Sequence, residues 1–405
     1  VVLNHALLFS SLALETDEIG RVLPEFPVLI LDEAHEIEDV ASEYFGNRLS
    51  NYQVQDFCRD LEKAYRGNTD VSKLADALAR KSDLFFTSFP GLEGKHSLNL
   101  YRDVSGSTTD LRFELGHQST DLKEGLLSVY HRLEREEPRA DETATLVRRL
   151  ERYLTSLEEI FDTDEPGNVY WFGRSHRGTS IHVNPIDVAP ALRENVFSRT
   201  DSTVLTSATL TTEENFTYLR ERLGIPEPEE LIVPGEFDYA TQALLYVPKT
   251  LPDPRSPERF PRLVQELSAI LQATQGSAFV LCTSYQLMTQ LYETLGEELG
   301  FPAMCQGEKP KSQLLEDFKG TPNTVLFATS SFWQGVDVQG DALKAVIIDK
   351  LPFQVPTEPI VAARLNQLER ERRNPFMEYS VPAAIISLRQ GLGRLIRSRE
   401  DTGIL

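Results

Sequence analysis

The sequence is poor in cysteine and has no long uninterrupted apolar segment. Its three cysteines, Cys58, Cys282 and Cys305, are far apart and form no Cys-x-x-Cys pair, which argues against a disulfide framework or a zinc site. No run approaches the roughly 18 consecutive apolar residues of a membrane-spanning helix, and the opening Val1–His5 lacks the basic residues of a signal peptide. These absences predict a soluble, cytoplasmic protein without a membrane partner.

Positive charge is also scarce. The chain has 41 Lys and Arg against 62 Asp and Glu, for a net charge of −21. Proteins that coat nucleic acid through bulk electrostatics need positive charge near the phosphates, so this balance is mild evidence against DNA binding. A motor that grips one strand needs only a local basic and aromatic track. At 405 residues with 40% hydrophobic content, the chain can form two or three domains with sizeable cores.

Five short apolar runs, each followed by polar side chains, predict buried parallel strands. They are Phe26–Leu31, Thr203–Thr206, Ala278–Leu281, Thr324–Phe327 and Ala345–Ile348. Helical patterns lie between the later runs, as in Tyr285–Leu299, where leucines recur at a spacing of four residues. The alternation indicates an α/β fold with parallel sheets.

The segment from about Asn51 to about Glu165 interrupts this alternation with charge and helical periodicity. One helix there has an apolar stripe on a single face. The stripe consists of Leu146, Leu150, Tyr153, Leu154 and Leu157. We therefore expect a mainly helical insertion between two pieces of one α/β domain, followed by a second α/β domain. The expected boundaries are 1–50 and 166–235 for the first domain, 51–165 for the insertion and 236–405 for the second domain.

The motif Asp32-Glu33-Ala34-His35 directly follows the first predicted strand, at the edge of the sheet where α/β proteins bind ligands. Asp32 can hold Mg²⁺ on the phosphates of a nucleotide, and Glu33 can orient and deprotonate an attacking water. Acidic residues also favour helix N-termini because of the helix dipole, so the motif alone leaves a structural role open.

The segment Gln390–Arg397, with the sequence QGLGRLIR, places Arg394 and Arg397 three residues apart, on one face of an expected helix. Two planar guanidinium groups at this spacing could reach one phosphate together, as an arginine finger does. The alternative is a solvated basic helix. The two glycines weaken that alternative, because glycine in a helix costs about 1 kcal/mol relative to alanine.

Two other polar segments also follow predicted strands. Thr206-Ser207-Ala208-Thr209 offers hydroxyls that can bond a carboxylate or a histidine such as His35, although Ser and Thr are common in turns. Ser330–Asp337 offers a glycine for close backbone approach, an aspartate that can accept from a ribose or an arginine, and two aromatic rings that could stack on bases. Trp333 in such a position is still more often a core residue than a ligand contact.

The order and spacing of these blocks are more specific than any one of them. The chain contains, in order, DEAH, TSATL, CTS, SSFWQGVD, IIDKLPF and QGLGRLIRS. This series resembles the XPD-like iron–sulfur helicases of superfamily 2, and looks closest to the bacterial DinG/YoaA branch, on its YoaA side. The opening Val2–Leu8 also resembles that branch, whereas the helical middle matches in placement more than in sequence.

The resemblance implies two RecA-like domains that close on ATP, with the helical insertion as an arch-type domain that helps enclose single-stranded DNA. The residues implied for Mg²⁺, ATP and catalysis are Asp32, Glu33, His35, Gly335, Asp337, Gln390, Gly393, Arg394 and Arg397. Those implied for coupling hydrolysis to movement are His35, Thr206, Ser207 and Thr209. Those implied for the nucleic acid track are Thr283, Ser284, Ser331 and Trp333.

By the same resemblance, the complete protein would hydrolyse ATP to translocate on single-stranded DNA and unwind forked or tailed duplexes, with 5′ to 3′ polarity. It would act in bacterial DNA repair or replication, with proteins of those pathways as partners. Two alternatives stay open, an ATP-controlled DNA-binding clamp and a motor accessory to an N-terminal nuclease. Glu33, Arg394 and Arg397 favour turnover over binding alone.

Two features of the family are missing from this sequence, the phosphate-binding loop and the four cysteines of a 4Fe-4S cluster. The only Gly-Lys pair, Gly94-Lys95, is followed by His96, and Phe89 stands where the first glycine of the loop is required. In the family both features precede the matched blocks. We therefore expect a chain truncated at both ends, with both features upstream of residue 1, that is inactive alone.

Overall fold

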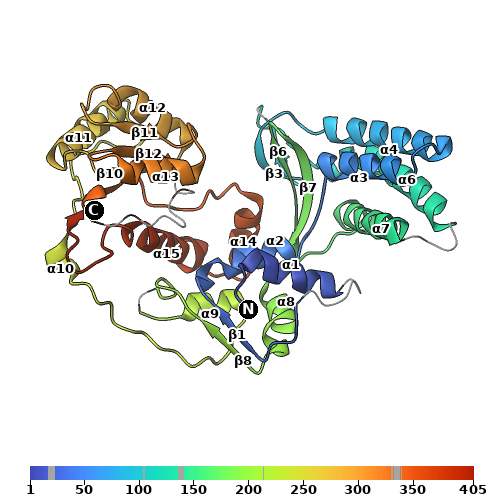
Figure 1. Cartoon of the computed structure of the whole chain (residues 1–405), viewed down its shortest axis with the longest axis horizontal. Helices are drawn as coiled ribbons and strands as arrows, with labels where there is room; N and C mark the ends of the chain where they lie inside the picture. Colours follow the sequence, from blue (N-terminus) through green and yellow to red (C-terminus); the bar gives the residue numbers. More distant parts are fainter. Residues whose placement is uncertain are drawn as a thin grey trace. The chain divides into compact units, whose positions relative to one another are not determined.

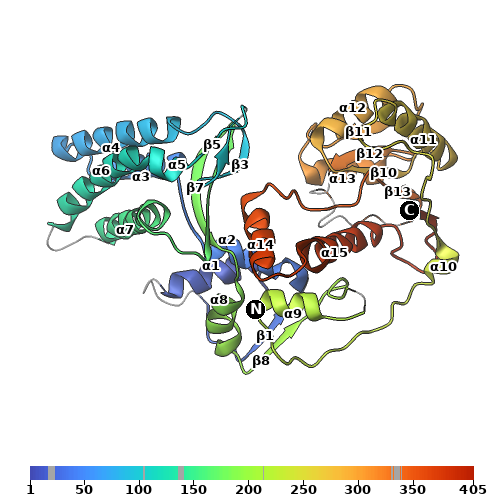
Figure 2. The same ribbon diagram turned by 180° about the vertical axis from the view of Figure 1, so that it is seen from behind.

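The computed structural model describes residues 1–16, 23–103, 105–135, 141–212, 214–329, 332, 338 and 340–405. The chain forms two compact units, each built from separate stretches (Figures 1 and 2). Unit 1 contains Val1–Ser207, Leu219–Pro226 and Val355–Pro375, and unit 2 contains Ala208–Tyr218, Glu227–Gln354 and Phe376–Leu405. This division differs from the boundaries expected from the sequence, because Val355–Pro375 packs with unit 1.

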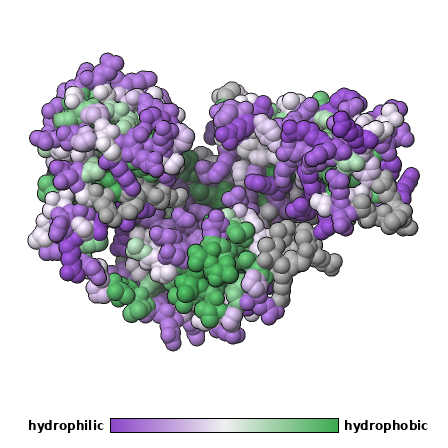
Figure 3. All heavy atoms as spheres, viewed as in Figure 1, coloured by the Kyte–Doolittle hydropathy of each residue, from purple (hydrophilic) through white to green (hydrophobic). Residues whose placement is uncertain are grey.

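Unit 1 contains a parallel pair of strands, β1 (Val28–Leu31) and β8 (Ser202–Leu205), with Leu31 opposite Leu205. Both strands were predicted, but their predicted burial is wrong for most positions. Leu31 is 2% exposed, whereas Val28 and Ile30 are 55% and 66% exposed. The physical reason is that, in the part of the chain that is described, no third strand joins this pair. A broad apolar region is visible around the N-terminus and β1 (Figure 3).

Short helices surround this strand pair. They are α1 (His5–Thr16), η1 (Ala34–Glu36), α2 (Ile37–Tyr44), α8 (Ala189–Asn195), η2 (Phe197–Arg199) and α9 (Thr217–Leu223). The turn η1 contains Ala34 and His35 of the DEAH motif, and α2 follows it directly. Ala34, Ile37 and Ala41 are fully buried. Burial of this apolar face fixes the direction in which η1 and α2 leave the strand.

The predicted insertion is mainly helical. Its helices are α3 (Asn51–Ala64), α4 (Thr69–Thr87), α5 (Leu111–Glu114), α6 (Gly116–Glu134) and α7 (Asp141–Phe161). Side-chain oxygens of Ser50 and Asn68 accept backbone N–H groups at the starts of α3 and α4, as expected of N-caps. The leucine stripe of α7 is confirmed, because Leu146, Leu150 and Leu157 lie in the shared core of these helices.

An antiparallel sheet that was not predicted lies beside these helices. Its strand order is β2-β7-β6-β3, with bounds Asn47–Ser50, Gly178–Pro185, Asn168–Ser175 and Gly94–Ser97. A second, two-stranded sheet pairs β4 (Tyr101–Arg102) with β5 (Thr108–Thr109). Phe172 and Ile181 point into the helical core, and on the other face Ala363 of α14 (Pro359–Arg370) packs against Trp171. The Gly94-Lys95 pair begins β3, so it is not a phosphate-binding loop.

Unit 2 is built on a six-stranded parallel sheet with the order β11-β12-β10-β13-β14-β9. The bounds in that order are Ala303–Cys305, Val325–Thr329, Ala278–Cys282, Ala345–Ile348, Gly403–Ile404 and Ala243–Leu244. Every residue of β10 and β12 is buried. The three strands predicted for this sheet are confirmed, and their apolar runs are continuous because both faces are covered.

Alternate residues of the central strand β10 face two different hydrophobic cores. Val280 packs with residues of α11 (Arg259–Ala273) and α12 (Tyr285–Leu295), while Phe279 and Leu281 pack with α13 (Lys311–Gly320). The other helices among the described residues of unit 2 are α10 (Tyr239–Gln242), η4 (Gly340–Ala342), the π-helix η5 (Phe376–Ser380) and α15 (Val381–Leu392). Among the described helices of the whole chain, none is both long and apolar enough to cross a bilayer.

Candidate active site

In unit 1 the backbone brings the DEAH motif to the start of the TSATL motif. The backbone N–H of Thr206 donates to the carbonyl oxygen of Leu31 at 2.9 Å, and that of Ala34 donates to the carbonyl oxygen of Thr206 at 3.0 Å. These bonds continue the parallel pairing of β1 and β8 past their carboxyl ends. The predicted placement of both motifs at one sheet edge is therefore correct.

Ser207 connects the two side chains that the sequence assigned to catalysis and coupling. Its hydroxyl donates to Glu33 Oε2 at 2.8 Å, and His35 Nδ1 lies 3.0 Å from the same hydroxyl oxygen. His35 Nδ1 is also 3.3 Å from Glu33 Oε2, and the exposed fractions of the two side chains are 7% and 53%. A solvent-facing carboxylate is thus held by a buried histidine and a serine, which leaves it open to water while fixing its orientation.

The backbone at Glu33 adopts the left-handed conformation, with φ 49° and ψ 46°. This conformation costs a residue with a Cβ atom roughly 1–2 kcal/mol, and such strain is concentrated at functional sites. The conformation lets the chain turn from β1 directly into η1, with the N–H of Glu33 donating to Asp32 Oδ1 at 3.0 Å. The sequence offered no signal for it, because glutamate is not a residue that favours positive φ.

Asp32 and Glu33 fit the requirements of a magnesium ion that arrives with a nucleotide. Both side chains are exposed, and Mg²⁺ typically takes one or two carboxylates together with waters and substrate phosphates. In the part of the chain that is described, no group of three or more His, Cys, Asp or Glu is arranged to hold a metal ion by itself. The two carboxylates therefore suit a substrate-borne ion.

The cysteines do not fit an iron–sulfur cluster. Cys58, Cys282 and Cys305 are buried and free, and a cluster of this type needs four thiolates. Burial raises the pKa of Cys58 and of Cys282 to about 12, and that of Cys305 to about 11. These buried thiols remain protonated at neutral pH.

In unit 2 the end of the TSATL motif meets the glutamine of the arginine motif. Gln390 Nε2 donates to Thr209 Oγ1 at 3.1 Å, and Thr209 is 6% exposed. One residue before Gln390, Arg389 Nη1 donates to the carbonyl oxygen of Thr211 at 2.6 Å. Two segments that are far apart in the sequence, and that were assigned to coupling and to catalysis, are therefore hydrogen-bonded to each other.

The expectation that Arg394 and Arg397 share a helical face is wrong. The helix α15 ends at Leu392 with Gly393 as its C-cap, and a Cβ atom at Gly393 would lie 3.0 Å from the carbonyl oxygen of Arg389. Arg394 follows in a turn, and Arg397 lies beyond that turn, where the Asp401 carboxylate accepts the N–H of Arg397 at 2.8 Å. The physical reason is the pair of glycines, which weakens the helix where the sequence pattern would extend it.

The alternative of a solvated basic helix is also wrong. Leu395 and Ile396, between the two arginines, are each 2% exposed and belong to the core on one face of the unit 2 sheet. Burial and the nearby charge of Arg394 lower the pKa of Lys311.

A further aspartate, which the sequence reasoning did not single out, holds the segment after β10. The Thr283 N–H donates to Asp349 Oδ1 at 2.8 Å, and the Thr283 hydroxyl donates to Asp349 Oδ2 at 3.1 Å. Burial raises the pKa of Asp349 above its usual value, against the effect of these hydrogen bonds. Its position directly after β13 was the signal that could have identified it.

Ser284 has a structural task, because its hydroxyl accepts the N–H of Leu287 at the start of α12. The sequence-based assignments of Ser331, Trp333, Gly335 and Asp337 fall outside the described residues. The structure thus forms two groups of assigned residues. Unit 1 contains Asp32, Glu33, His35, Thr206 and Ser207, and unit 2 contains Thr209, Thr283, Ser284, Gln390, Gly393, Arg394 and Arg397.

Comparison with known proteins shows that the chain is similar to helicases. Residues 267–405 match a family model described as a helicase C-terminal domain. The chain is 36% identical to the ATP-dependent DNA helicase YoaA of Escherichia coli (strain K12), over 100% of this chain and 63% of that protein. It is 29% identical to the ATP-dependent helicase DinG of Mycobacterium tuberculosis (strain ATCC 25618 / H37Rv), over 100% of this chain and 60% of that protein.

The fold is related to that of XPD. A solved XPD helicase structure superposes with a TM-score of 0.56 and 15% sequence identity, covering 98% of this chain and 67% of that chain. The structure of S. tokodaii Xpd4 gives a TM-score of 0.55 and 16% identity, covering 95% of this chain and 72% of that chain. The chain is therefore similar in sequence to the YoaA and DinG helicases, its residues 267–405 match a helicase C-terminal domain, and it shares the fold of the XPD structures.

Proposed function

We propose that this chain is the motor portion of an ATP-dependent DNA helicase, which uses ATP hydrolysis to move along single-stranded DNA and separate duplexes. The observation that carries the proposal is the cluster of Glu33, Ser207 and His35 at the carboxyl ends of β1 and β8. It is supported by relatives named ATP-dependent helicases. The chain spans 63% of the length of the YoaA protein that it matches, so the activity proposed is that of the complete protein.

In the proposed reaction, Glu33 orients a water and takes its proton as the water attacks the γ-phosphorus of ATP. Asp32 and Glu33 would hold the Mg²⁺ that accompanies the nucleotide, and this ion would neutralise charge on the phosphates. The bond from phosphorus to the bridging oxygen breaks, and ADP leaves. Arg394 and Arg397 would contact the γ-phosphate, where fixed guanidinium groups stabilise the charge of the transferring group.

The same contacts offer a route from hydrolysis to movement. Ser207 hydrogen-bonds the proposed base Glu33, and Thr209, two residues later, hydrogen-bonds Gln390 of the arginine motif. A change in the charge around Glu33 therefore acts at one end of the three-residue segment Ser207–Thr209, whose other end bonds Gln390. We assign the coupling role to this segment, and the role of DNA contacts to the segment after β10 that begins with Thr283.

The proposal is tested by Glu33→Gln in the complete protein. Glutamine keeps the shape and a carbonyl oxygen for Ser207 but cannot accept the proton of the water. We expect turnover to fall on the order of 10²- to 10⁴-fold while ATP affinity changes little. Glu43→Gln is the matched control, because Glu43 is a solvent-exposed glutamate of α2 that pairs with Arg48. DNA-stimulated ATP hydrolysis and nucleotide binding are measured for both.

Near-normal turnover in the Glu33→Gln protein would contradict the assignment of the base. A wild-type protein that binds DNA in an ATP-dependent way but hydrolyses no ATP would instead support the alternative of a DNA-binding clamp. One relative, from Bacillus subtilis (strain 168), is named a 3′-5′ exonuclease and is 27% identical over 49% of its own length. Tailed DNA and RNA duplexes of both polarities, with gel analysis of strand length, separate unwinding from strand degradation.

A further inference from the structure

A buried group of charges lies at the start of α2, the helix that continues from the DEAH motif. Glu38 is in the first turn of α2, and its side chain is 11% exposed. Arg364 of α14 contacts Glu38 Oε1 through Nη2 at 2.7 Å, and the Arg364 side chain is 2% exposed. Arg222 of α9 donates to the same carboxylate oxygen through Nε at 3.0 Å. One buried carboxylate therefore joins three helices of unit 1.

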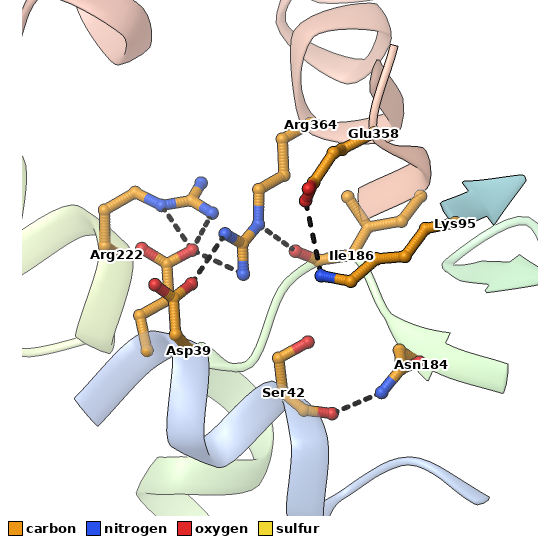
Figure 4. Close-up of polar contacts among 9 residues, drawn as sticks. Asp39, Ser42, Lys95, Asn184, Ile186, Arg222, Glu358 and Arg364 are labelled. Carbon is orange, nitrogen blue, oxygen red and sulfur yellow. Dashed lines mark hydrogen bonds and ion pairs between the residues drawn. The ribbon is translucent and has the colours of Figure 1, made fainter. Parts of the chain in front are cut away.

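Arg364 has further contacts around the same point. Its Nη1 donates to Asp39 Oδ1 and its Nε to the carbonyl oxygen of Ile186, both at 3.4 Å. Figure 4 shows the Arg364 side chain descending from α14 toward Asp39 and Ile186, with the Arg222 guanidinium approaching from the opposite side. A single guanidinium group thus ties α14 to α2 and to the segment that follows β7.

The charge balance makes this arrangement depend on the arginines. Burial by itself raises the pKa of Glu38, but the charges of Arg364 and Arg222 outweigh it and lower the pKa below its usual value. The carboxylate is therefore ionised at neutral pH. Removal of one partner of a buried ion pair leaves an uncompensated charge, which is strongly unfavourable in place. Without Arg364, Glu38 would keep only Arg222 as a counter-charge, so its buried charge would be less well compensated and α2 would shift to bring Glu38 closer to water.

Such a shift would be transmitted to the proposed catalytic groups over a very short stretch of chain. The helix α2 begins at Ile37, directly after the turn η1 that contains His35, and the left-handed Glu33 caps that turn. We propose that Arg364 is a positioning residue for ATP hydrolysis, which holds α2 through Glu38 and so keeps Glu33 and His35 in place beside Ser207. This inference rests on the proposed function.

Arg364 lies in a stretch of unit 1 that is flanked in the sequence by stretches of unit 2. Val355–Pro375 belongs to unit 1, but the chain on either side of it, Glu227–Gln354 and Phe376–Leu405, belongs to unit 2. The arginine motif follows on the same stretch of chain, in and after α15. Arg364 therefore ties to α2 a stretch of unit 1 that lies, in the sequence, between two stretches of unit 2.

The test compares Arg364→Met with a matched variant in the complete protein. Arg373→Met is the control, because Arg373 comes from the same segment of unit 1 and forms a partly exposed ion pair with Glu221 of α9 at 2.7 Å. For Arg364→Met we expect kcat to fall on the order of 10- to 100-fold, as small misplacements of catalytic groups do, with KM for ATP within about two-fold. For Arg373→Met both constants should stay near those of the wild type.

Arg364→Lys supplies a second readout. Lysine keeps a charge beside Glu38 but cannot reproduce the planar fork that also reaches Asp39 and Ile186, so it should restore part of the lost kcat. Thermal unfolding is measured for every variant, and kinetics are recorded well below each midpoint. If Arg364→Met does not fold, Glu38→Gln tests the same link, because it removes the charge that holds α2 with little change in shape, and it should also lower kcat.

A folded Arg364→Met or Glu38→Gln protein with wild-type kcat would overturn the positioning role. An equal loss of kcat in Arg373→Met would overturn it too, since that would indicate a general effect of losing an ion pair. A rise in KM with unchanged kcat would also contradict it, because it would mean that ATP binding had been weakened. Absence of ATPase activity in the wild-type complete protein would instead overturn the proposed function, and this inference with it.

Discussion

The two parallel sheets look alike in sequence but differ in their surroundings. In unit 1 the strands β1 and β8 expose Val28, Ile30 and Val204 by 55%, 66% and 47%. In unit 2 every residue of β10 and β12 is buried. Both pairs were predicted from the same kind of apolar run. An apolar run therefore identifies a strand, whereas its burial is decided by the strands and helices that pack beside it.

The loops at the carboxyl ends of the strands are also held by different interactions in the two units. In unit 2 the sheet is covered on both faces by helices, and the loop after β10 is held by side-chain bonds from Thr283 to Asp349. In unit 1 the strand pair is less covered, and the loop after β1 is held by backbone bonds, by the left-handed Glu33 and by the charges around Glu38. The unit with the proposed water-activating group thus depends more on local and polar constraints.

The largest expected effect compares core positions in the two sheets. Phe327 lies in β12 and is fully buried, so Phe327→Ala should lower the free energy of unfolding by about 3–5 kcal/mol. Ile30→Ala, in the exposed part of β1, should cost less than about 1 kcal/mol, as exposed positions usually do. Urea unfolding of both variants measures the difference. Equal losses would show that β1 is as well packed as β12 and would remove the contrast.

The second prediction concerns pH, because the histidines are unevenly distributed. All 7 histidines lie between His5 and His182, and hence in unit 1. His182 stacks on Trp171 with ring centroids 3.8 Å apart. Burial, with smaller contributions from the charges of Arg48 and Lys95, lowers the pKa of His182 from 6.5 to about 3.

The direction of the pH effect on stability follows from the pKa of His182 in the unfolded and folded states. Above about pH 6.5 the His182 ring is neutral in both the folded and unfolded states, and between 6.5 and about 3 only the unfolded chain binds the proton. Stability is therefore lost as the pH falls through this range. His182→Gln should lose less unfolding free energy between pH 7 and pH 5 than the wild type, whereas His117→Gln, whose native side chain is 88% exposed, should behave as the wild type. Parallel losses in all three proteins would rule out this source of pH sensitivity.

The smallest expected effect tests the backbone at the two strand ends. At Glu33 the φ angle is 49°, so Glu33→Gly should be more stable than Glu33→Ala by about 1 kcal/mol, because glycine lacks the Cβ atom that makes this conformation costly. Thr283 is not among the residues with positive φ, and there the order should reverse, with Thr283→Ala more stable than Thr283→Gly. Chemical denaturation gives both differences. The same order at both positions would mean that the strand ends do not differ in backbone strain.

Much of the fold could be predicted from local sequence. The runs that became β1, β8, β10, β12 and β13 and the stripe of α7 follow the ordinary periods of strands and helices. The antiparallel sheet was missed, although the tight connection of β6 to β7 through His176 and Arg177 was a readable hairpin. The packing of α14 with unit 1 could not be predicted, because it depends on contacts with residues several hundred positions earlier.

The sequence predicted which residues would meet at the strand end in unit 1, but it did not predict the backbone geometry of the arginine motif. The types and places of Glu33, His35 and Ser207 follow from motifs at strand ends, and the structure brings these three side chains within hydrogen-bond distance. The end of α15 before Arg394 was missed, because the helical period was extended through two glycines. The role of Arg364 had no local signal, since an arginine in a charged helix looks the same whether it is buried or solvated.

The division of unit 1 into three separate stretches has a consequence for the synthesis of the protein. A ribosome delivers the chain from its N-terminus, and domains made of one continuous stretch can fold as they emerge. Unit 1 cannot, because its last stretch ends at Pro375. Asp39 and its neighbour Glu38 must wait for an arginine that is 325 residues away from Asp39 along the chain. During that interval Glu38 has Arg222 but not Arg364 as a counter-charge, so the helix behind the DEAH motif reaches its final position only after most of the sheet of unit 2 has been made.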